Sequence, residues 1–278
     1  MVSFGFLGPK GTFTEIALQT YVSKENLDVN CVGYTSINQL FSALGSGECE
    51  SVIVPIENSV EGSVTTVVDH LIRLKNMYIT AELVLKIEHN LMVKDVSLGI
   101  TDIISHSQPI AQCREYLNKY YPDVSFHNAA SSAQAADFVS HYSGDKVYGV
   151  IGHESLARLY DFSILEKEIN DSKDNRTRFF IISGTIHEPT GHDKSTIVFS
   201  ALKDQAGSLA TVLNEFKSKS INLTHISSRP TKEMLGEYLF YIDCEGHVKD
   251  NALSEVLKVI ETKTSYIKYL GSYPRIKN

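Results

Sequence analysis

The feature that most constrains this chain is a regular alternation of short apolar runs and amphipathic segments across residues 1–183. Apolar runs at 2–7, 31–34 and 51–55 predict buried strands, and each is followed by apolar residues at helical spacing. Such alternation of strand and helix favours an α/β fold with parallel strands. The length of this region is enough for one large domain or two lobes of one domain.

A second block of the same kind begins near residue 78. It predicts strands at 81–87, 102–105, 124–127 and 147–151 and helices at 109–119 and 131–141. Two α/β blocks in succession predict a body of two lobes with a cleft between them. We place lobe 1 at about residues 1–77 and 160–183, and lobe 2 at about 78–159.

Composition changes at residues 184–194, GTIHEPTGHDK, where proline, glycine and polar residues replace the periodic pattern. We interpret this stretch as a linker. Behind it, strands at 195–202, 222–228, 239–243 and 265–270 and two amphipathic helices follow in the order βαββαβ. That order is typical of a ferredoxin-like domain, which we place at residues 195–278.

Charge and cysteine content narrow the classes of partner. The 278 residues include 26 Lys and Arg against 33 Asp and Glu, a net charge of −7. This balance disfavours a nucleic-acid partner, which needs a basic patch. No run approaches 18 apolar residues and no signal peptide opens the chain, so we expect a cytoplasmic protein with no membrane partner. The four cysteines are scattered, with no C-x-x-C pair, which fits a reducing compartment.

Five polar segments stand where predicted strands or helices meet. They are GPKGTFTE at 8–15, PIENSVEG at 55–62, SHSQP at 105–109, NAASS at 128–132 and DSKDNRTRFF at 171–180. Ligands gather outside the carboxyl ends of strands in open α/β sheets, and helix N-termini bind anions. Arg178, at the start of an apolar strand, suits bidentate contact with a carboxylate. Each segment alone is also compatible with a capped turn or a surface ion pair, and the spacing of a P-loop or a dinucleotide fingerprint is missing.

Taken together, the five segments resemble the prephenate dehydratase family over about residues 2–275. The matching stretches are GPKGTFTE at 8–15, PIENSVEG at 55–62, SHSQPIAQC at 105–113, AASSAQAA at 129–136 and DSKDNRTRF at 171–179. The resemblance implies a two-lobed catalytic domain similar to type II periplasmic binding proteins, followed by an ACT regulatory domain. Because the first strand begins at Val2, we expect a monofunctional enzyme without a fused chorismate mutase.

The resemblance also implies roles for individual residues. The implied catalytic set is Thr177, Arg178, Phe179, Glu57 and His106, with Thr177 as its key member. The implied substrate-binding set is Thr12, Asn58, Ser59, Ser131, Ser132 and Asn175. The implied effector-binding set is Gly207, Ser208, Leu209, Asn222, Ser227, Ser228, Arg229 and Pro230. Ser208 and Ser227 depart from the Ala and Glu of the family's effector motifs, which leaves the affinity and identity of the effector open.

The implied reaction converts prephenate to phenylpyruvate, water and carbon dioxide in phenylalanine biosynthesis, with L-phenylalanine as allosteric effector. Aromatisation drives this reaction, so we expect no cofactor and no metal. We hypothesise that Thr177 donates a hydrogen bond to the departing hydroxyl, with Glu57 and His106 as alternative sources of the proton. By resemblance we expect a dimer or tetramer with phenylalanine bound between paired ACT domains. Two other functions stay open: an arogenate dehydratase, which acts on the aminated analogue, and a non-catalytic sensor of an aromatic metabolite.

Overall fold

The computed structural model describes residues 2–202, 205–230 and 238–276. The chain divides into two compact units. Unit 1 comprises Met1–Cys49, Ile53–Val64 and Val84–Phe179, and unit 2 comprises Glu50–Val52, Thr65–Leu83 and Phe180–Asn278. Within the described ranges, no helix is both long enough and apolar enough to cross a bilayer.

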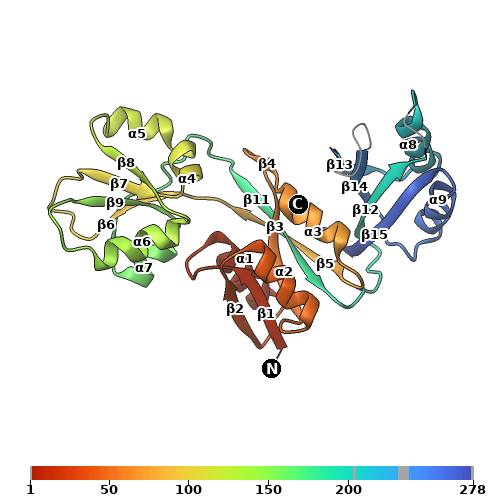
Figure 1. The fold of residues 1–278 in the computed structure, drawn as a ribbon, viewed down its shortest axis with the longest axis horizontal. Coiled ribbons are helices and arrows are strands. Elements are labelled where there is room, and N and C mark those ends of the chain that lie inside the picture. The colour runs from red at the N-terminus through yellow and green to blue at the C-terminus, as the bar shows by residue number, and fades with distance from the viewer. Residues whose placement is uncertain (1, 203–204, 231–237, 277–278) are drawn as a thin grey trace. The chain divides into compact units, whose positions relative to one another are not determined.

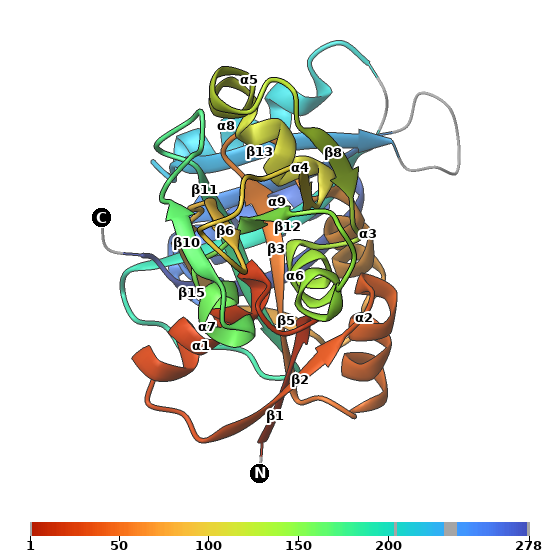
Figure 2. The same cartoon turned by 90° about the vertical axis from the view of Figure 1, so that its left-hand side faces the viewer.

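The first sheet has the strand order β2-β1-β3-β11-β5, with β4 paired to β3. Its strands are β1 (Val2–Leu7), β2 (Val29–Tyr34), β3 (Ser51–Asn58), β4 (Gly62–Ser63), β5 (Tyr78–Lys86) and β11 (Arg176–Ser183). Helices α1 (Phe13–Lys24) and α2 (Ile37–Ser46) connect the first three strands. β1 and β2 run side by side and parallel, as the alternation predicted (Figures 1 and 2). β3, β5 and β11 pass from one unit into the other.

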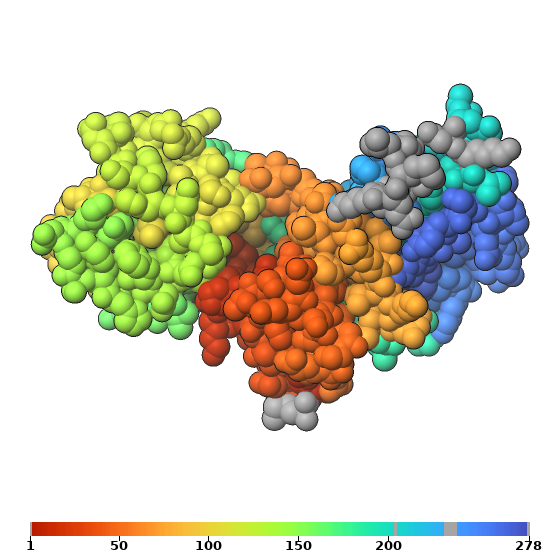
Figure 3. Space-filling model, in the orientation of Figure 1, coloured from red at the N-terminus to blue at the C-terminus, as the bar shows by residue number. Residues whose placement is uncertain are grey.

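The second sheet lies in unit 1 and has the order β10-β6-β9-β7-β8. Its strands are β6 (Asn90–Val93), β7 (Asp102–Ser105), β8 (Ser125–Asn128), β9 (Tyr148–Gly152) and β10 (Ser163–Glu166). The helices around it are α4 (Ser107–Gln112), α5 (Arg114–Tyr120), α6 (Ser132–His141) and α7 (Ser155–Tyr160). In Figure 3 the yellow-green to green residues of this region form one contiguous body.

The two sheets repeat one pattern of connection. In each, the first strand of a block lies between the second and the third, and the next position is taken by a strand from outside the block. This strand from outside the block is β11 in the first sheet and β6 in the second. β6 pairs antiparallel with β9. The chain thus crosses between the sheets twice, and each sheet is the centre of one α/β lobe. The lobe bounds differ from those predicted, because β5, predicted in lobe 2, pairs in the first sheet, and β10, predicted in lobe 1, pairs in the second.

The remaining part of unit 2 is a ferredoxin-like domain with the sheet order β13-β14-β12-β15. Its elements are β12 (Asp193–Ala201), α8 (Ser208–Ser218), β13 (Leu223–Pro230), β14 (Tyr238–Glu245), α9 (Asn251–Glu261) and β15 (Thr264–Pro274). The predicted order βαββαβ is therefore confirmed. Helices α8 and α9 cover the same face of the sheet (Figure 1), where Phe199, Phe216 and Ile260 form part of one apolar core. Helix α3 (Thr65–Arg73) also belongs to unit 2.

Three features differ from the sequence-based expectations. The single helix predicted at 109–119 is two helices, α4 and α5, which meet at Cys113. The Asp171 carboxylate explains the break, because it accepts the backbone N–H of Glu115 at 3.1 Å and so caps α5 from a distant segment. Strand β12 begins at Asp193, inside the predicted linker. Finally, β6, α7 and β10 are short elements with no clear periodicity in the sequence, and they were not predicted.

Candidate active site

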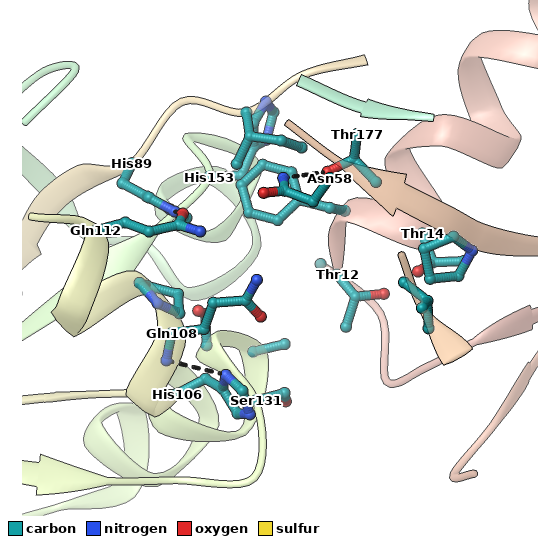
Figure 4. Close-up of a pocket in the computed structure, with 18 of the residues that line it drawn as sticks. Thr12, Thr14, Asn58, His89, His106, Gln108, Gln112, Ser131, His153 and Thr177 are labelled. Carbon is teal, nitrogen blue, oxygen red and sulfur yellow. Dashed lines mark hydrogen bonds between the residues drawn. The ribbon is translucent and has the colours of Figure 1, made fainter. Parts of the chain in front are cut away.

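A cavity of about 270 Å³ lies in unit 1, between residues of the first sheet and residues of α4 and α6. The residues that line it come from seven regions of the chain. They are Gly11, Thr12, Phe13, Thr14, Pro55, Asn58, Val64, Ile87, His89, His106, Gln108, Pro109, Gln112, Ala130, Ser131, Ser132, Ala133, His153, Thr177 and Phe179. Figure 4 shows Asn58 and Thr177 on one side of this cavity and His106 and Gln108 on another.

Two helix N-termini open onto the cavity. Thr12 caps α1 by accepting the N–H of Glu15 at 3.4 Å, and Ser131 caps α6 by accepting the N–H of Gln134 at 3.0 Å. The first residues of both helices, Phe13 and Ser132 among them, line the cavity. Their N–H groups have no acceptor within the helix, and the helix dipole adds positive potential at the same place. The cavity therefore offers two anion-binding ends without a formal charge.

The lining carries little charge. Among the described residues that line the cavity there is no Asp, Glu, Lys or Arg. Burial lowers the pKa of His89 to about 4, and burial also lowers the pKa of His153 below its ordinary value. Both imidazoles are therefore neutral at neutral pH. Phe13 lies between them, with its ring 5.5 Å from that of His89 and 5.6 Å from that of His153.

The hydroxyl of Thr177 is held by Asn58. The Asn58 side-chain N–H donates to Thr177 Oγ1 at 2.9 Å (Figure 4). Asn58 Oδ1 accepts the backbone N–H groups of Val60 and Glu61 at 2.9 and 3.0 Å, so the orientation of its amide group is fixed. Thr177 Oγ1 must therefore be the acceptor in this bond. The hydroxyl hydrogen of Thr177 makes no hydrogen bond to any of the residues that the structure describes.

Seven of the predicted catalytic and substrate-binding residues line the cavity: Thr12, Asn58, His106, Ser131, Ser132, Thr177 and Phe179. His106 Nδ1 accepts the N–H of Gln108 at 3.3 Å, which leaves Nε2 of its ring as the donor in the neutral form. The Ser132 hydroxyl lies 2.9 Å from that of Ser105, which itself donates to the Ile151 carbonyl at 2.6 Å. The Ser132 hydrogen is therefore directed to Ser105.

The other four predicted residues, Glu57, Ser59, Asn175 and Arg178, do not line the cavity. The expectation that Arg178 faces the substrate beside Thr177 is not met, because successive residues of a strand point to opposite faces. Arg178 Nη1 instead lies 3.6 Å from the Glu57 carboxylate. Glu57 and Asn58 are likewise successive residues of β3 and point to opposite faces. Asn58 and Thr177 therefore form a polar pair at the cavity, and Glu57 and Arg178 form an ion pair away from it.

Ser59 and Asn175 bond to protein groups. Ser59 Oγ accepts the backbone N–H of Arg176 at 2.9 Å, which joins the turn after β3 to the start of β11. Asn175 is almost fully buried and accepts the Asn58 side-chain N–H at 2.8 Å. Its own side-chain N–H donates to Gln112 Oε1 at 2.8 Å. Both residues therefore hold the walls of the cavity together.

The predicted effector residues lie in the ferredoxin-like domain. Gly207 has a φ of 87° and precedes α8, which begins at Ser208, and Leu209 packs against the core of the domain. The side-chain N–H of Asn222 donates to Glu245 at 3.3 Å. The edge strand β13 carries the other four residues, Ser227, Ser228, Arg229 and Pro230. Arg229 is engaged within unit 2. Its guanidinium lies 3.0 Å from the Asp69 carboxylate of α3 and donates to the Thr65 carbonyl.

Sequence reasoning missed six polar or aromatic lining residues: Phe13, Thr14, His89, Gln108, Gln112 and His153. Four of them, Phe13, Thr14, Gln108 and Gln112, lie inside the matching motifs, but the motifs alone do not show which of their side chains face a cavity. His89 and His153 lie in segments without a clear periodic pattern, so no signal placed them. The three-residue clusters of His, Cys, Asp or Glu that a metal ion needs are absent from the residues described.

The fold and site define a class of protein: a two-lobed α/β enzyme whose cavity suits a small anion, followed by a ferredoxin-like domain. A family model described as prephenate dehydratase matches residues 4–186, and an ACT domain model matches residues 195–262. The chain therefore belongs to the prephenate dehydratase family, lyases that form phenylpyruvate in phenylalanine biosynthesis.

Individual relatives agree with this assignment. The chain is 39% identical to prephenate dehydratase of Methanocaldococcus jannaschii over 96% of each chain. It is 34% identical to prephenate dehydratase of Bacillus subtilis over 97% of each chain. Among solved structures, it is similar to prephenate dehydratase from Arthrobacter aurescens in complex with L-Phe, with a TM-score of 0.89 and 32% identity, covering 99% of this chain and 90% of that chain.

Proposed function

We propose that Thr177 is the hydrogen-bond donor to the leaving hydroxyl of prephenate in the cavity of unit 1. In the reaction, the bond between the ring and its carboxylate breaks and carbon dioxide leaves. The electron pair completes the aromatic ring, and the ring hydroxyl takes one proton and departs as water. The observation that carries the proposal is the polarity of the Asn58–Thr177 bond. It leaves the Thr177 hydrogen available on a residue that lines the cavity.

Ser132 is a poorer candidate for this donor. Its hydroxyl hydrogen is directed to Ser105, as the chain of bonds from Ser105 to Ile151 requires. Ser132 and Thr12 instead mark the two helix N-termini whose amide N–H groups would hold the carboxylates of the substrate. In a closed cavity these fixed dipoles act more strongly than they would in water.

His106 is the better of the two proton sources considered above. A threonine hydroxyl is a weak acid and must polarise the leaving oxygen or relay a proton to it. His106 lines the cavity, where its imidazolium form would carry the proton, whereas Glu57 lies outside the lining beside Arg178. We assign the proton to His106, and we assign the Glu57–Arg178 pair to support of the strands that carry Asn58 and Thr177.

The cavity also favours prephenate over arogenate. Arogenate carries an ammonium group where prephenate has a ketone, and a buried ammonium needs a carboxylate partner. Among the described lining residues there is no Asp or Glu to supply one. A side-chain amide donor such as that of Gln108 suits a ketone oxygen. We therefore expect the higher kcat/KM with prephenate.

The experiment that tests the proposal measures phenylpyruvate formed from prephenate by Thr177→Val and Thr177→Ser. We expect the valine variant to lose about 10²-fold in kcat or more, because general acid assistance contributes roughly that much. The serine variant keeps a hydroxyl and should retain most of the activity. A valine variant with wild-type kcat would remove Thr177 from the role of donor. Arogenate as a second substrate tests the preference.

For regulation, we propose that L-phenylalanine binds at the ACT domain, at the turn before α8 and along β13. Gly207 leaves the backbone open at that turn, and β13 is an edge strand of its sheet. Pairing of two such edges would complete the effector site, so we propose a dimer or tetramer. Inhibition by phenylalanine that disappears in a monomeric variant would support this, and light scattering that finds a monomer in the regulated enzyme would contradict it.

Two further points belong to the same proposal. The catalytic domain ends near residue 183, where β11 ends, and the ACT domain begins with β12 at Asp193, so that only residues 184–192 of the predicted linker at 184–194 connect the two. We also propose that the enzyme acts in the cytoplasm, in support of which the described cysteines, Cys31, Cys49, Cys113 and Cys244, are all free thiols.

A further inference from the structure

A chain of side-chain amides connects Thr177 to α4 on another wall of the cavity. We call Asn58, Asn175 and Gln112 the amide chain. Asn58 donates to Asn175 Oδ1 at 2.8 Å, Asn175 donates to Gln112 Oε1 at 2.8 Å, and Gln112 Nε2 donates to the Glu61 carboxylate at 3.1 Å. All of these residues belong to unit 1. The chain ends on Glu61, an exposed residue of the turn between β3 and β4.

Each end of the amide chain has a group that allows only one orientation. At the first end, Asn58 Oδ1 faces two backbone N–H groups, so Asn58 must donate toward Asn175 and Thr177. At the other end, the ionised Glu61 carboxylate can only accept, so the Gln112 side-chain N–H must face it. Gln112 Oε1 then faces Asn175, which must donate. The direction of every bond follows, and reversal of any one amide would bring two donors or two acceptors together.

His89 provides an independent observation at the same oxygen. Its Nε2 lies 2.9 Å from Gln112 Oε1, and the orientation of Gln112 makes Nε2 the donor. His89 is 2% exposed, and its Nδ1 is a buried acceptor without a recorded partner among the described residues. A neutral His89 with its proton on Nε2 supports the Gln112 orientation from a second side. Gln112 thus accepts two bonds and donates one, all with side chains.

We propose that Gln112, oriented by Glu61, is a positioning residue: it supports from the far end of the amide chain the direction that the backbone N–H groups of Val60 and Glu61 impose on Asn58, and so helps to keep the Thr177 hydroxyl hydrogen facing the cavity. The effect passes through Asn175 and Asn58 and requires no contact of Gln112 with the substrate. This inference rests on the proposed role of Thr177 as donor. It adds to that role an exposed acid, Glu61, whose bond to Gln112 favours the same polarity of the buried Asn58–Thr177 hydrogen bond.

The test uses charge reversal at the exposed end of the chain. In Glu61→Lys a donor replaces the acceptor, and Gln112 must turn its oxygen toward the lysine. Its N–H group then meets the Asn175 N–H, and the amide chain loses its single direction. We expect kcat for prephenate to fall at least about tenfold, while KM changes by less than about threefold, because the affected bond acts in the transition state.

A second variant distinguishes polarity from simple packing. In Glu61→Lys/Gln112→Glu, the introduced carboxylate pairs with the lysine and accepts from Asn175 and His89. The wild-type direction returns, so kcat should recover to within about threefold of wild type. Glu50→Lys is the matched control, because Glu50 is also exposed and has no recorded side-chain bond in the described part of the chain. It should keep wild-type kcat.

The outcomes separate cleanly. A Glu61→Lys enzyme with wild-type kcat would overturn the inference, and so would a double variant no more active than Glu61→Lys. A parallel measurement with Thr177→Val keeps the two proposals apart. If Thr177→Val is impaired and Glu61→Lys is not, only the role of Gln112 fails. If Thr177→Val retains wild-type kcat, the proposed donor itself fails. Thermal unfolding of each variant shows that the chain has folded.

Discussion

The N-termini of α1 and α6, at the cavity of unit 1, differ from the C-terminus of α3, in unit 2, in the groups that cap them. At the cavity, α1 and α6 have short hydroxyl caps, Thr12 and Ser131, and the first residues of both helices line open space. In unit 2, the C-terminal carbonyls of α3 are closed by Lys268 of β15. Its ammonium donates to Leu71 O at 3.0 Å and Ile72 O at 2.8 Å, and also to the Leu74 carbonyl.

The difference teaches how to tell a ligand site from a structural contact. A helix terminus that a protein side chain already satisfies has little to offer a ligand, whereas one left to short hydroxyl caps keeps amide groups for an anion. The charged residues of the motifs follow the same division. Arg178 lies 3.6 Å from the Glu57 carboxylate and Arg229 lies 3.0 Å from that of Asp69, so both guanidinium groups have protein partners in this structure. The cavity offers neutral dipoles in their place.

The strongest way to break this comparison is to place a charge inside the neutral cavity at Asn58. In Asn58→Asp one carboxylate oxygen keeps the backbone N–H groups of Val60 and Glu61, and the other faces Thr177. The Thr177 hydroxyl then donates to the introduced carboxylate and no longer to the substrate. We expect kcat to fall about 10²-fold, as far as in Thr177→Val, because the same donor is lost. Phenylpyruvate formation from prephenate measures the change.

The matched control for this variant is Ser59→Ala, which removes a neighbouring polar group that bonds to the Arg176 N–H outside the cavity. It should lower stability slightly and leave kcat near wild type. An Asn58→Asp enzyme with normal kcat would mean that Thr177 does not need the polarity that Asn58 imposes. Circular dichroism of both variants checks that the fold is intact.

The next prediction concerns the cost of keeping the cavity neutral. His89 has a folded pKa of about 4 because of burial, against about 6.5 when unfolded. As pH falls through this window the unfolded chain binds a proton that the folded chain does not, so stability declines as pH decreases. The contribution reaches up to about 3 kcal/mol by pH 4. Urea unfolding at pH 7 and pH 4.5 should show a larger loss for wild type than for His89→Gln, and equal losses would contradict the assignment.

Much of the fold was predictable because strands and helices leave local patterns. The strand at 2–7 and the helices capped by Thr12 and Ser131 follow from apolar spacing and capping residues. The break at Cys113 was not predictable, because it depends on Asp171, which lies 58 positions away along the chain from Cys113. Contacts of that kind are decided by tertiary structure and leave no trace in local periodicity.

The site shows the same limit. Motif resemblance selected Asn58 and Thr177, which the structure brings together in one hydrogen bond. It also selected Arg178, which does not line the cavity. Alternation along a strand predicts that Thr177 and Arg178 face opposite ways, but it does not predict which of the two faces the cavity. His89 and Gln112 lie 23 positions apart and meet only in the folded chain. No spacing rule connects them, so their contact became visible only in the structure.

A third prediction tests the charged side of the comparison. Lys268→Met keeps the aliphatic stem and leaves the C-terminal carbonyls of α3 without their ammonium donor. We expect the free energy of unfolding to fall by about 2 kcal/mol, since buried acceptors left without a donor cost roughly 1–3 kcal/mol. Chemical denaturation of the two proteins measures the difference. Because Lys268 lies in unit 2, phenylpyruvate formation under folding conditions should be little changed, and a large loss of kcat would show that α3 affects the cavity.

The smallest expected effect belongs to a charge pair at the surface of unit 1. Arg158 and Glu154 lie four residues apart, with a separation of 3.6 Å and side chains 74% and 43% exposed. Water already solvates both groups, so the pair gains little from contact. Arg158→Gln should change the free energy of unfolding by less than about 0.5 kcal/mol. The prediction attributes the larger effect of Lys268 to its bonds with the backbone carbonyls at the end of α3. An equally large loss of stability in Arg158→Gln would contradict this explanation, because the Arg158–Glu154 pair is exposed.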